Sequence, residues 1–150
     1  MKITALLALI TATPLFVACS QAPAAGPVAT PAPVKLTIEA KEFSFSPSHA
    51  TVKVGQTVEI VLKNIGVITH DFTIEKIALK DKAVEHGAEH AMDNMGGLDP
   101  DTLPIHVAAE TNHEGDVTFI PTEAGEYEFF CTVAGHKVSG MFGKLTVVAQ

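Results

Sequence analysis

Apolar and polar residues alternate along most of the chain after residue 35, in short runs that glycine and proline separate. The clearest run is Val58, Ile60 and Leu62, which alternate with the polar or charged residues Thr57, Glu59 and Lys63. Because successive side chains of a strand point to opposite faces, this pattern predicts half-buried strands. Short strands with turn residues between them predict an all-β sandwich, with strands expected near residues 36–38, 43–45, 52–54, 57–63, 70–74, 116–120, 125–131 and 144–149.

Two details refine this architecture. The alternation changes parity between Ile38 and Phe43, which predicts a bulge or kink near residues 40–42. Tyr127 lies near the start of its strand, where a tyrosine corner would pin a Greek-key crossover. We therefore expect a Greek-key antiparallel β-sandwich over residues 35–150.

Residues 77–115 show the least regular pattern of apolar and polar positions. We interpret them as a partly helical insertion in the sandwich. His86 and His90 are four residues apart and would share one face of a helix, with Met92 and Met95 nearby. These four side chains could form a second copper site that loads or stores metal. The alternative, which we favour, is a solvated segment that collects histidines, because its glycines weaken a helix.

The N-terminal residues have a different composition. Residues 1–18 contain one positive charge and then an apolar run too short to span a bilayer, which is typical of an export signal. Cys19 follows Ala18 in a sequence that resembles a bacterial lipobox, where the cysteine becomes lipidated; ordinary cleavage with a free Cys19 is the alternative. With a Pro- and Ala-rich tether, residues 19–34 predict a membrane-anchored lipoprotein of a bacterial cell envelope or periplasm.

The charge balance excludes one class of partner. Ten lysines and no arginine stand against seventeen acidic residues, for a formal net charge of −7. A nucleic-acid partner is not expected, because its phosphates need a cationic surface. An acidic surface suits a basic docking partner instead.

The chemistry of the chain is concentrated near its C-terminus, where Cys131, His136 and Met141 follow the spacing Cys-x4-His-x4-Met. A thiolate, an imidazole and a thioether are soft or borderline metal donors. Structural zinc has no use for a thioether, whereas copper alternates between Cu(I), which favours sulfur, and Cu(II), which favours nitrogen. Two histidines, one cysteine and a weak axial methionine form the blue-copper arrangement, so one histidine is still missing.

His70 is the best candidate for the missing ligand. Alternation places His70 with Phe72 and Ile74 on one apolar face of a strand, so its ring is expected to point inward. The same pattern sends the Cys131 sulfur toward the core. His49, His106 and His113 are expected either to lie at the surface or to surround the metal ligands without binding the metal. Each predicted ligand also has a plainer interpretation, as a buried thiol, a surface or core histidine, or a core methionine.

These residues resemble those of the cupredoxins, the small blue copper proteins of the plastocyanin and auracyanin type. The resemblance rests on Gly125-x-Tyr127-x-Phe129-x-Cys131 with the following glycines, His136 and Met141, and on Asn64-x-Gly66-x-x-x-His70-Asp71-Phe72. It implies a β-sandwich with one type 1 copper at one end, held by His70, Cys131, His136 and Met141. Cupredoxins often carry Asn after the first histidine, where this chain has Asp71.

The resemblance also implies a function, which is to carry single electrons between larger redox proteins. We expect a monomer that docks transiently with a cytochrome, an oxidase or a reductase near His136. The alternative is an envelope protein that buffers or delivers copper. An enzyme is not expected, because a copper oxidase or nitrite reductase needs His-x-His sites and a second domain, and the sequence contains no His-x-His.

Overall fold

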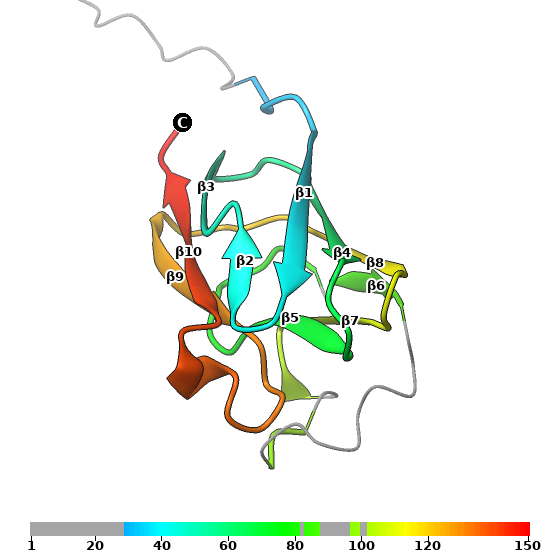
Figure 1. The fold of residues 1–150 in the computed structure, drawn as a ribbon. Coiled ribbons are helices and arrows are strands. Elements are labelled where there is room, and N and C mark those ends of the chain that lie inside the picture. The colour runs from blue at the N-terminus through cyan, green and yellow to red at the C-terminus, as the bar shows by residue number, and fades with distance from the viewer. Residues whose placement is uncertain (1–28, 82, 88–96, 100–101) are drawn as a thin grey trace, which may run out of the picture.

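The computed structural model describes residues 29–81, 83–87, 97–99 and 102–150, which form two five-stranded β-sheets (Figure 1). The strand order is β2-β1-β4-β8-β6 in the first sheet and β3-β10-β9-β5-β7 in the second. The strands are β1 (Val34–Lys41), β2 (Ser44–Ser46), β3 (His49–Lys53), β4 (Val58–Asn64), β5 (His70–Ile74), β6 (Val84–His86), β7 (Ile105–Ala109), β8 (Glu114–Phe119), β9 (Gly125–Phe130) and β10 (Phe142–Val148).

Aromatic side chains from both sheets meet in the core. Phe72 of β5 stacks on Phe129 of β9 with ring centroids 4.7 Å apart, and Phe45 of β2 packs edge-on against Phe129 at 5.4 Å. The alternating residues Ile60 and Leu62 of β4 are fully buried beside them. The predicted sandwich is therefore confirmed, with its core between the two sheets.

The sheets are mixed. β1 pairs with β4 and β10 pairs with β3 in parallel, whereas the other strand pairs are antiparallel. The purely antiparallel sandwich that we expected is corrected on this point. Parallel partners come from distant parts of the chain, so the local alternation of side chains carries no information about their direction.

The β1–β2 connection differs from the expected bulge. Lys41 and Ser44 are paired across a two-residue turn that consists of Glu42 and Phe43. Phe43 has a positive φ of 62° and its side chain is 49% exposed. The change of parity in the sequence thus marks a chain reversal, which carries Phe43 out of the core.

Parts of the expected insertion over residues 77–115 belong to the two sheets. Its last part, β7, pairs with β5, and all five residues of β7 are buried. β6 pairs with the edge of β8, so His86 lies on a strand and not on a helix. A strand buried on both faces has no alternating pattern, which explains why β7 was missed.

Tyr127 forms the predicted corner. Its hydroxyl donates a hydrogen bond to the backbone carbonyl of Glu123 over 3.0 Å. This contact fixes the chain where it enters β9, the strand that leads to Cys131.

Residues 1–28 lie outside the described part of the chain, together with the expected signal and lipidation site at Cys19. Among the described residues, no helix has the length and apolar character needed to cross a bilayer.

Candidate metal centre

Three of the predicted ligands converge in space. The nitrogens of His70 and His136 and the sulfur of Cys131 all lie within 4.8 Å of one another, and the three side chains are buried. Cys131 Sγ is 3.3 Å from Nδ1 of His136 and 3.9 Å from Nδ1 of His70. Residues 61 positions apart in the sequence are therefore brought to one point by the neighbouring strands β5 and β9.

The loop between β9 and β10 closes the site at the lower end of the molecule in Figure 1. Its short 3-10 helix, η2 (Lys137–Ser139), ends at Gly140, which has a φ of 104°. This left-handed conformation favours glycine because a Cβ would be strained there. The turn returns the chain toward the start of β10.

Met141 follows this turn and is fully buried. Its backbone N–H donates to the His136 carbonyl over 3.0 Å, and its carbonyl accepts from the Cys131 N–H over 3.2 Å. The backbone of Met141 is thus hydrogen-bonded to both of the other predicted ligands in the loop.

The loop before His70 is fixed by the buried side chain of Asn64. Its amide donates to the carbonyls of Ile68 (2.7 Å) and Ala109 (2.9 Å), while its side-chain oxygen accepts from the Gly66 N–H (2.9 Å). A Cβ on Gly66 would lie only 2.9 Å from His70 Nε2, so this position requires glycine. The first histidine is held from behind by backbone.

Burial and charge set the protonation of the site without metal. Burial raises the pKa of the Cys131 thiol to about 12, and the negative charge of Asp71 acts in the same direction. Hydrogen bonds from the backbone N–H groups of Asp71 and Val133 to the sulfur act in the opposite direction. Burial also lowers the pKa of His70, and so does the charge of His136, which keeps the His70 ring neutral and able to bind a metal.

These donors fit copper. One thiol sulfur and two imidazole Nδ1 atoms face one another in a buried space, and a methionine is buried at the end of the same loop. A set of nitrogen and sulfur donors of this kind suits copper in both oxidation states.

Two residues beside the site were not predicted. Glu42 Oε1 lies 3.7 Å from Nε2 of His70, and Phe43 packs edge-on against the ring of His136 with centroids 5.4 Å apart. The hydrogen bond from the Val67 N–H lowers the pKa of Glu42. Both residues belong to the β1–β2 turn. The sequence pattern indicates only that the strand is irregular there and does not indicate a turn.

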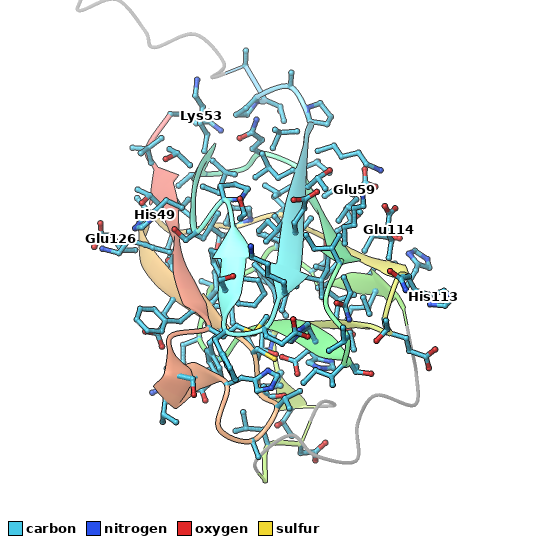
Figure 2. The ribbon with its side chains drawn as sticks, in the orientation of Figure 1. His49, Lys53, Glu59, His113, Glu114 and Glu126 are labelled. Atoms are coloured by element: carbon cyan, nitrogen blue, oxygen red, sulfur yellow. The ribbon has the colours of Figure 1, made fainter. Side chains whose placement is uncertain are left out.

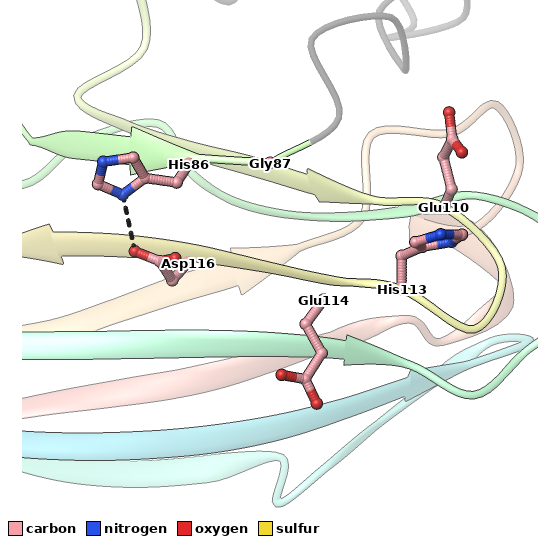
Figure 3. Close-up of a pocket in the computed structure, with 6 residues that line it drawn as sticks. All are labelled: His86, Gly87, Glu110, His113, Glu114 and Asp116. Carbon is pink, nitrogen blue, oxygen red and sulfur yellow. Dashed lines mark hydrogen bonds and ion pairs between the residues drawn. The ribbon is translucent and has the colours of Figure 1, made fainter.

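The expected second site is described only in part. His90, Met92 and Met95 lie outside the described residues. His86 is exposed on β6, where its Nδ1 lies 3.0 Å from Oδ2 of Asp116 (Figure 3). A surface groove of about 410 Å³ continues from this pair, and it is lined by His86, Gly87, Glu110, His113, Glu114 and Asp116.

The remaining histidines are separate from the site. His49 and His113 are exposed on the flanks of the sandwich (Figure 2). His106 is 2% exposed on β7, which excludes the first of its two expected positions, at the surface, and its Nε2 has no hydrogen-bond partner among the described residues. β7 is an edge strand of the second sheet, yet all five of its residues, His106 among them, are buried.

Comparison with known proteins agrees with this geometry. Residues 32–148 match the family described as copper binding proteins of the plastocyanin/azurin type. The solved structure of auracyanin A, a "blue" copper protein from the green thermophilic photosynthetic bacterium Chloroflexus aurantiacus, is similar with a TM-score of 0.57 and 28% identity. That similarity covers 77% of this chain and 99% of auracyanin A.

Two curated relatives carry a different name. The copper-resistant cuproprotein CopI of Rubrivivax gelatinosus is 36% identical over 104 residues, which are 69% of this chain and 59% of the relative. CopI of Pseudomonas aeruginosa is 30% identical in an alignment 132 residues long that covers 71% of this chain and 71% of the relative. The chain thus spans less than two thirds of the R. gelatinosus relative. From the family match and the fold together, the chain belongs to the plastocyanin/azurin family of copper-binding proteins, the cupredoxins.

Proposed function

We propose that this protein carries single electrons in a bacterial cell envelope, with one type 1 copper held by His70, Cys131, His136 and Met141. The observation that supports this proposal best is the convergence of Cys131 Sγ with the Nδ1 atoms of both histidines in a buried space. When bound there, copper supplies a one-electron couple between Cu(I) and Cu(II).

The protein's part is to hold the donors still. Asn64 fixes the loop before His70, and backbone hydrogen bonds tie Cys131, His136 and Met141 to one another. Because the donors are anchored on strands and short loops, they need to move little when the charge at the site changes. A small rearrangement favours fast electron transfer.

A partner would dock at the end of the sandwich that carries the loops. Exposed apolar side chains lie in the segments around the site: Phe43, Ile65, Val67, Ile68, Val138 and Phe142. Val67 and Val138 are 79% and 91% exposed, which leaves a broad apolar area for a transient complex. The negative net charge suits a cytochrome, oxidase or reductase with a basic rim.

The proposed location follows from the N-terminal sequence. Export through residues 1–18, lipidation at Cys19 and a tether up to residue 34 would hold the copper domain, residues 35–150, near a membrane surface. Metabolic labelling with a lipid precursor tests this, and a Cys19→Ala variant that still fractionates with membranes would contradict it.

The spectrum of the copper-loaded protein tests the proposed function. Adding Cu(II) should produce an intense blue thiolate-to-copper band that reductant bleaches and oxidant restores. Cys131→Ser should abolish the band. A weak band that survives this substitution would place the copper elsewhere and contradict the proposal.

A second candidate function is copper buffering or delivery, which the names of the two CopI relatives favour. The groove beside His86 and Asp116 adds a surface with imidazole and carboxylate groups to this hypothesis. The two functions separate under a chelator. A carrier keeps its copper through repeated reduction and oxidation in the presence of a strong Cu(I) ligand, whereas a delivery protein surrenders it.

Enzyme activity is not part of the proposal. A single copper held by four side chains has no open position for oxygen or nitrite. Turnover of either compound by the purified protein would contradict this view.

A further inference from the structure

One short turn touches both predicted histidine ligands. Glu42 and Phe43 connect β1 to β2, and their side chains diverge toward His70 and His136 respectively. His70 and His136 themselves lie with ring centroids 5.1 Å apart. The turn therefore lies directly against the proposed copper site and contacts the loop between β9 and β10 through Phe43.

Glu42 contacts the ring nitrogen of His70 that faces away from Cys131. Nε2 of His70 is fully buried and has no hydrogen-bond partner within the described structure. A buried N–H without an acceptor is costly, by about 1–3 kcal/mol. The Oε1 atom of Glu42, 3.7 Å away, is an acceptor of the right chemistry, and the Val67 N–H already orients it over 2.7 Å.

The contact of Phe43 with His136 explains why His136 is buried. His136 is only 5% exposed, although it lies on the loop at the end of the molecule. Phe43 packs edge-on over its ring at an interplanar angle of 83°, and half of the Phe43 side chain faces solvent. Phe43 does so with a positive φ, a conformation that costs a non-glycine residue about 1–3 kcal/mol. The ring is held over His136 in spite of this strain.

We propose that the Glu42–Phe43 turn is an outer clamp of the copper site. The Glu42 carboxylate accepts the Nε2 proton of His70, which holds the ring with Nδ1 toward Cys131 and adds a negative charge that favours Cu(II). The Phe43 ring shields His136 from water and becomes the surface through which a partner approaches it. A metal-bound histidine commonly donates its second ring N–H to a carboxylate or carbonyl, and loss of this partner typically costs about 10–100-fold in metal affinity.

The Glu42 half of the proposal is tested with Glu42→Gln, which keeps an oxygen for the Val67 N–H and removes only the charge. Glu59→Gln is the matched control, because it removes a carboxylate paired with Lys35 at the far end of the sandwich (Figure 2). We expect Cu(II) affinity to fall about tenfold more than Cu(I) affinity in Glu42→Gln, which raises the reduction potential by about 59 mV. Equal potentials in the two variants would overturn the role of Glu42, whereas a merely structural role would change stability and leave the potential unchanged.

A second measurement uses the protein without metal. Nitrogen-15 NMR of the apo-protein should show His70 protonated at Nε2, and Glu42→Ala should abolish that preference. A wild-type His70 protonated at Nδ1 would contradict the proposal. This inference rests on the proposed function, and the two can fail separately. A wild-type protein without a blue band would reject the proposed copper site. The NMR result would still test the contact between Glu42 and His70.

The Phe43 half is tested by chemical modification of His136 in the apo-protein, read out by mass spectrometry. Phe43→Gly removes the ring and relieves the strained φ, so His136 should be acylated at least several-fold faster while stability is kept. Phe43→Tyr retains the ring and should protect His136 as the wild type does. Equal rates in all three proteins would overturn the shielding role.

Discussion

The Asp71 carboxylate accepts two hydrogen bonds from Thr132, one from the backbone N–H over 2.8 Å and one from the hydroxyl over 2.6 Å. Each residue directly follows a predicted ligand, since Asp71 comes after His70 and Thr132 after Cys131. The pair therefore locks the two ligand-bearing segments together. Asp71 is only 3% exposed, so this carboxylate also brings a negative charge close to the thiol.

Removing that charge should make the thiol more acidic. In Asp71→Asn, the side-chain oxygen can still accept the Thr132 N–H and the amide can donate to the hydroxyl, so the fold should be kept. Because the charge of Asp71 contributes to the raised pKa of Cys131, the pKa should fall in the variant. Titration of the apo-protein, followed by the ultraviolet absorbance of the thiolate, measures this change. An unchanged pKa would show that burial alone raises it.

The Thr132 hydroxyl should contribute to stability. Thr132→Val keeps the side-chain shape and the backbone hydrogen bond but leaves the buried carboxylate with one donor fewer. The free energy of unfolding should fall by about 1–3 kcal/mol, measured by urea denaturation of the apo-protein. Thr146→Val, at a half-buried position of β10, is the control and should change stability by less than about 0.5 kcal/mol. An equal loss of unfolding free energy in the two variants would show that the hydrogen bond between Thr132 and Asp71 has no special role in stability.

Met141→Leu should distinguish two roles of Met141, as an axial copper ligand and as a packing residue of the loop. The side chains are similar in volume, so the fully buried position should tolerate the change. Copper should stay bound, and the reduction potential should rise by about 59 mV for each tenfold loss of Cu(II) affinity relative to Cu(I). Voltammetry and the visible spectrum measure both effects. Loss of all copper would instead show that Met141 shapes the loop.

The sequence was sufficient to predict that the side chains of His70 and Cys131 point into the core. His70 is buried at the start of β5 and Cys131 at the end of β9, as the alternation of apolar residues around each had indicated. In both cases the information is local, because a strand with one apolar face determines the direction of its side chains. The approach of His136 to Cys131 follows from a short loop with glycine at its bends.

The outer parts of the site were not predictable in the same way. Glu42 and Phe43 lie near the histidines only because a two-residue hairpin at the edge of the first sheet brings them there. Nothing in the local pattern distinguishes a hairpin from a bulge at this position. β7 was missed for a related reason: its five residues are all buried, so the run contains no periodicity.

The backbone behind His70 should not tolerate a methyl group. In Gly66→Ala, the new Cβ would lie 2.9 Å from His70 Nε2 and 2.7 Å from Glu42 Oε1, so the ring or the loop must shift. Copper affinity should fall about 10–100-fold, measured by competition with a chelator. Gly97→Ala is the control: with a φ of 90° at this position it also strains the backbone, but a Cβ there meets no atom within 4 Å, so copper affinity should be unchanged. Wild-type affinity in Gly66→Ala would contradict the close packing behind the ligand.

The buried thiol should make the stability of the apo-protein depend on alkaline pH. The pKa of Cys131 is about 12 in the folded chain and 9.0 without its surroundings, so the folded state holds the proton more tightly. The stabilisation that this provides is complete below pH 9.0 and is lost as the pH rises toward 12. Its upper bound is about 4 kcal/mol, since one pKa unit corresponds to about 1.4 kcal/mol. Urea denaturation of the wild type and of Cys131→Ser across this range measures the difference, in which the titration of the lysines cancels. If both proteins lose stability in parallel, ionisation of the thiol is not the cause of the loss. The raised pKa of Cys131 would then not add to the free energy needed to remove its proton when copper binds.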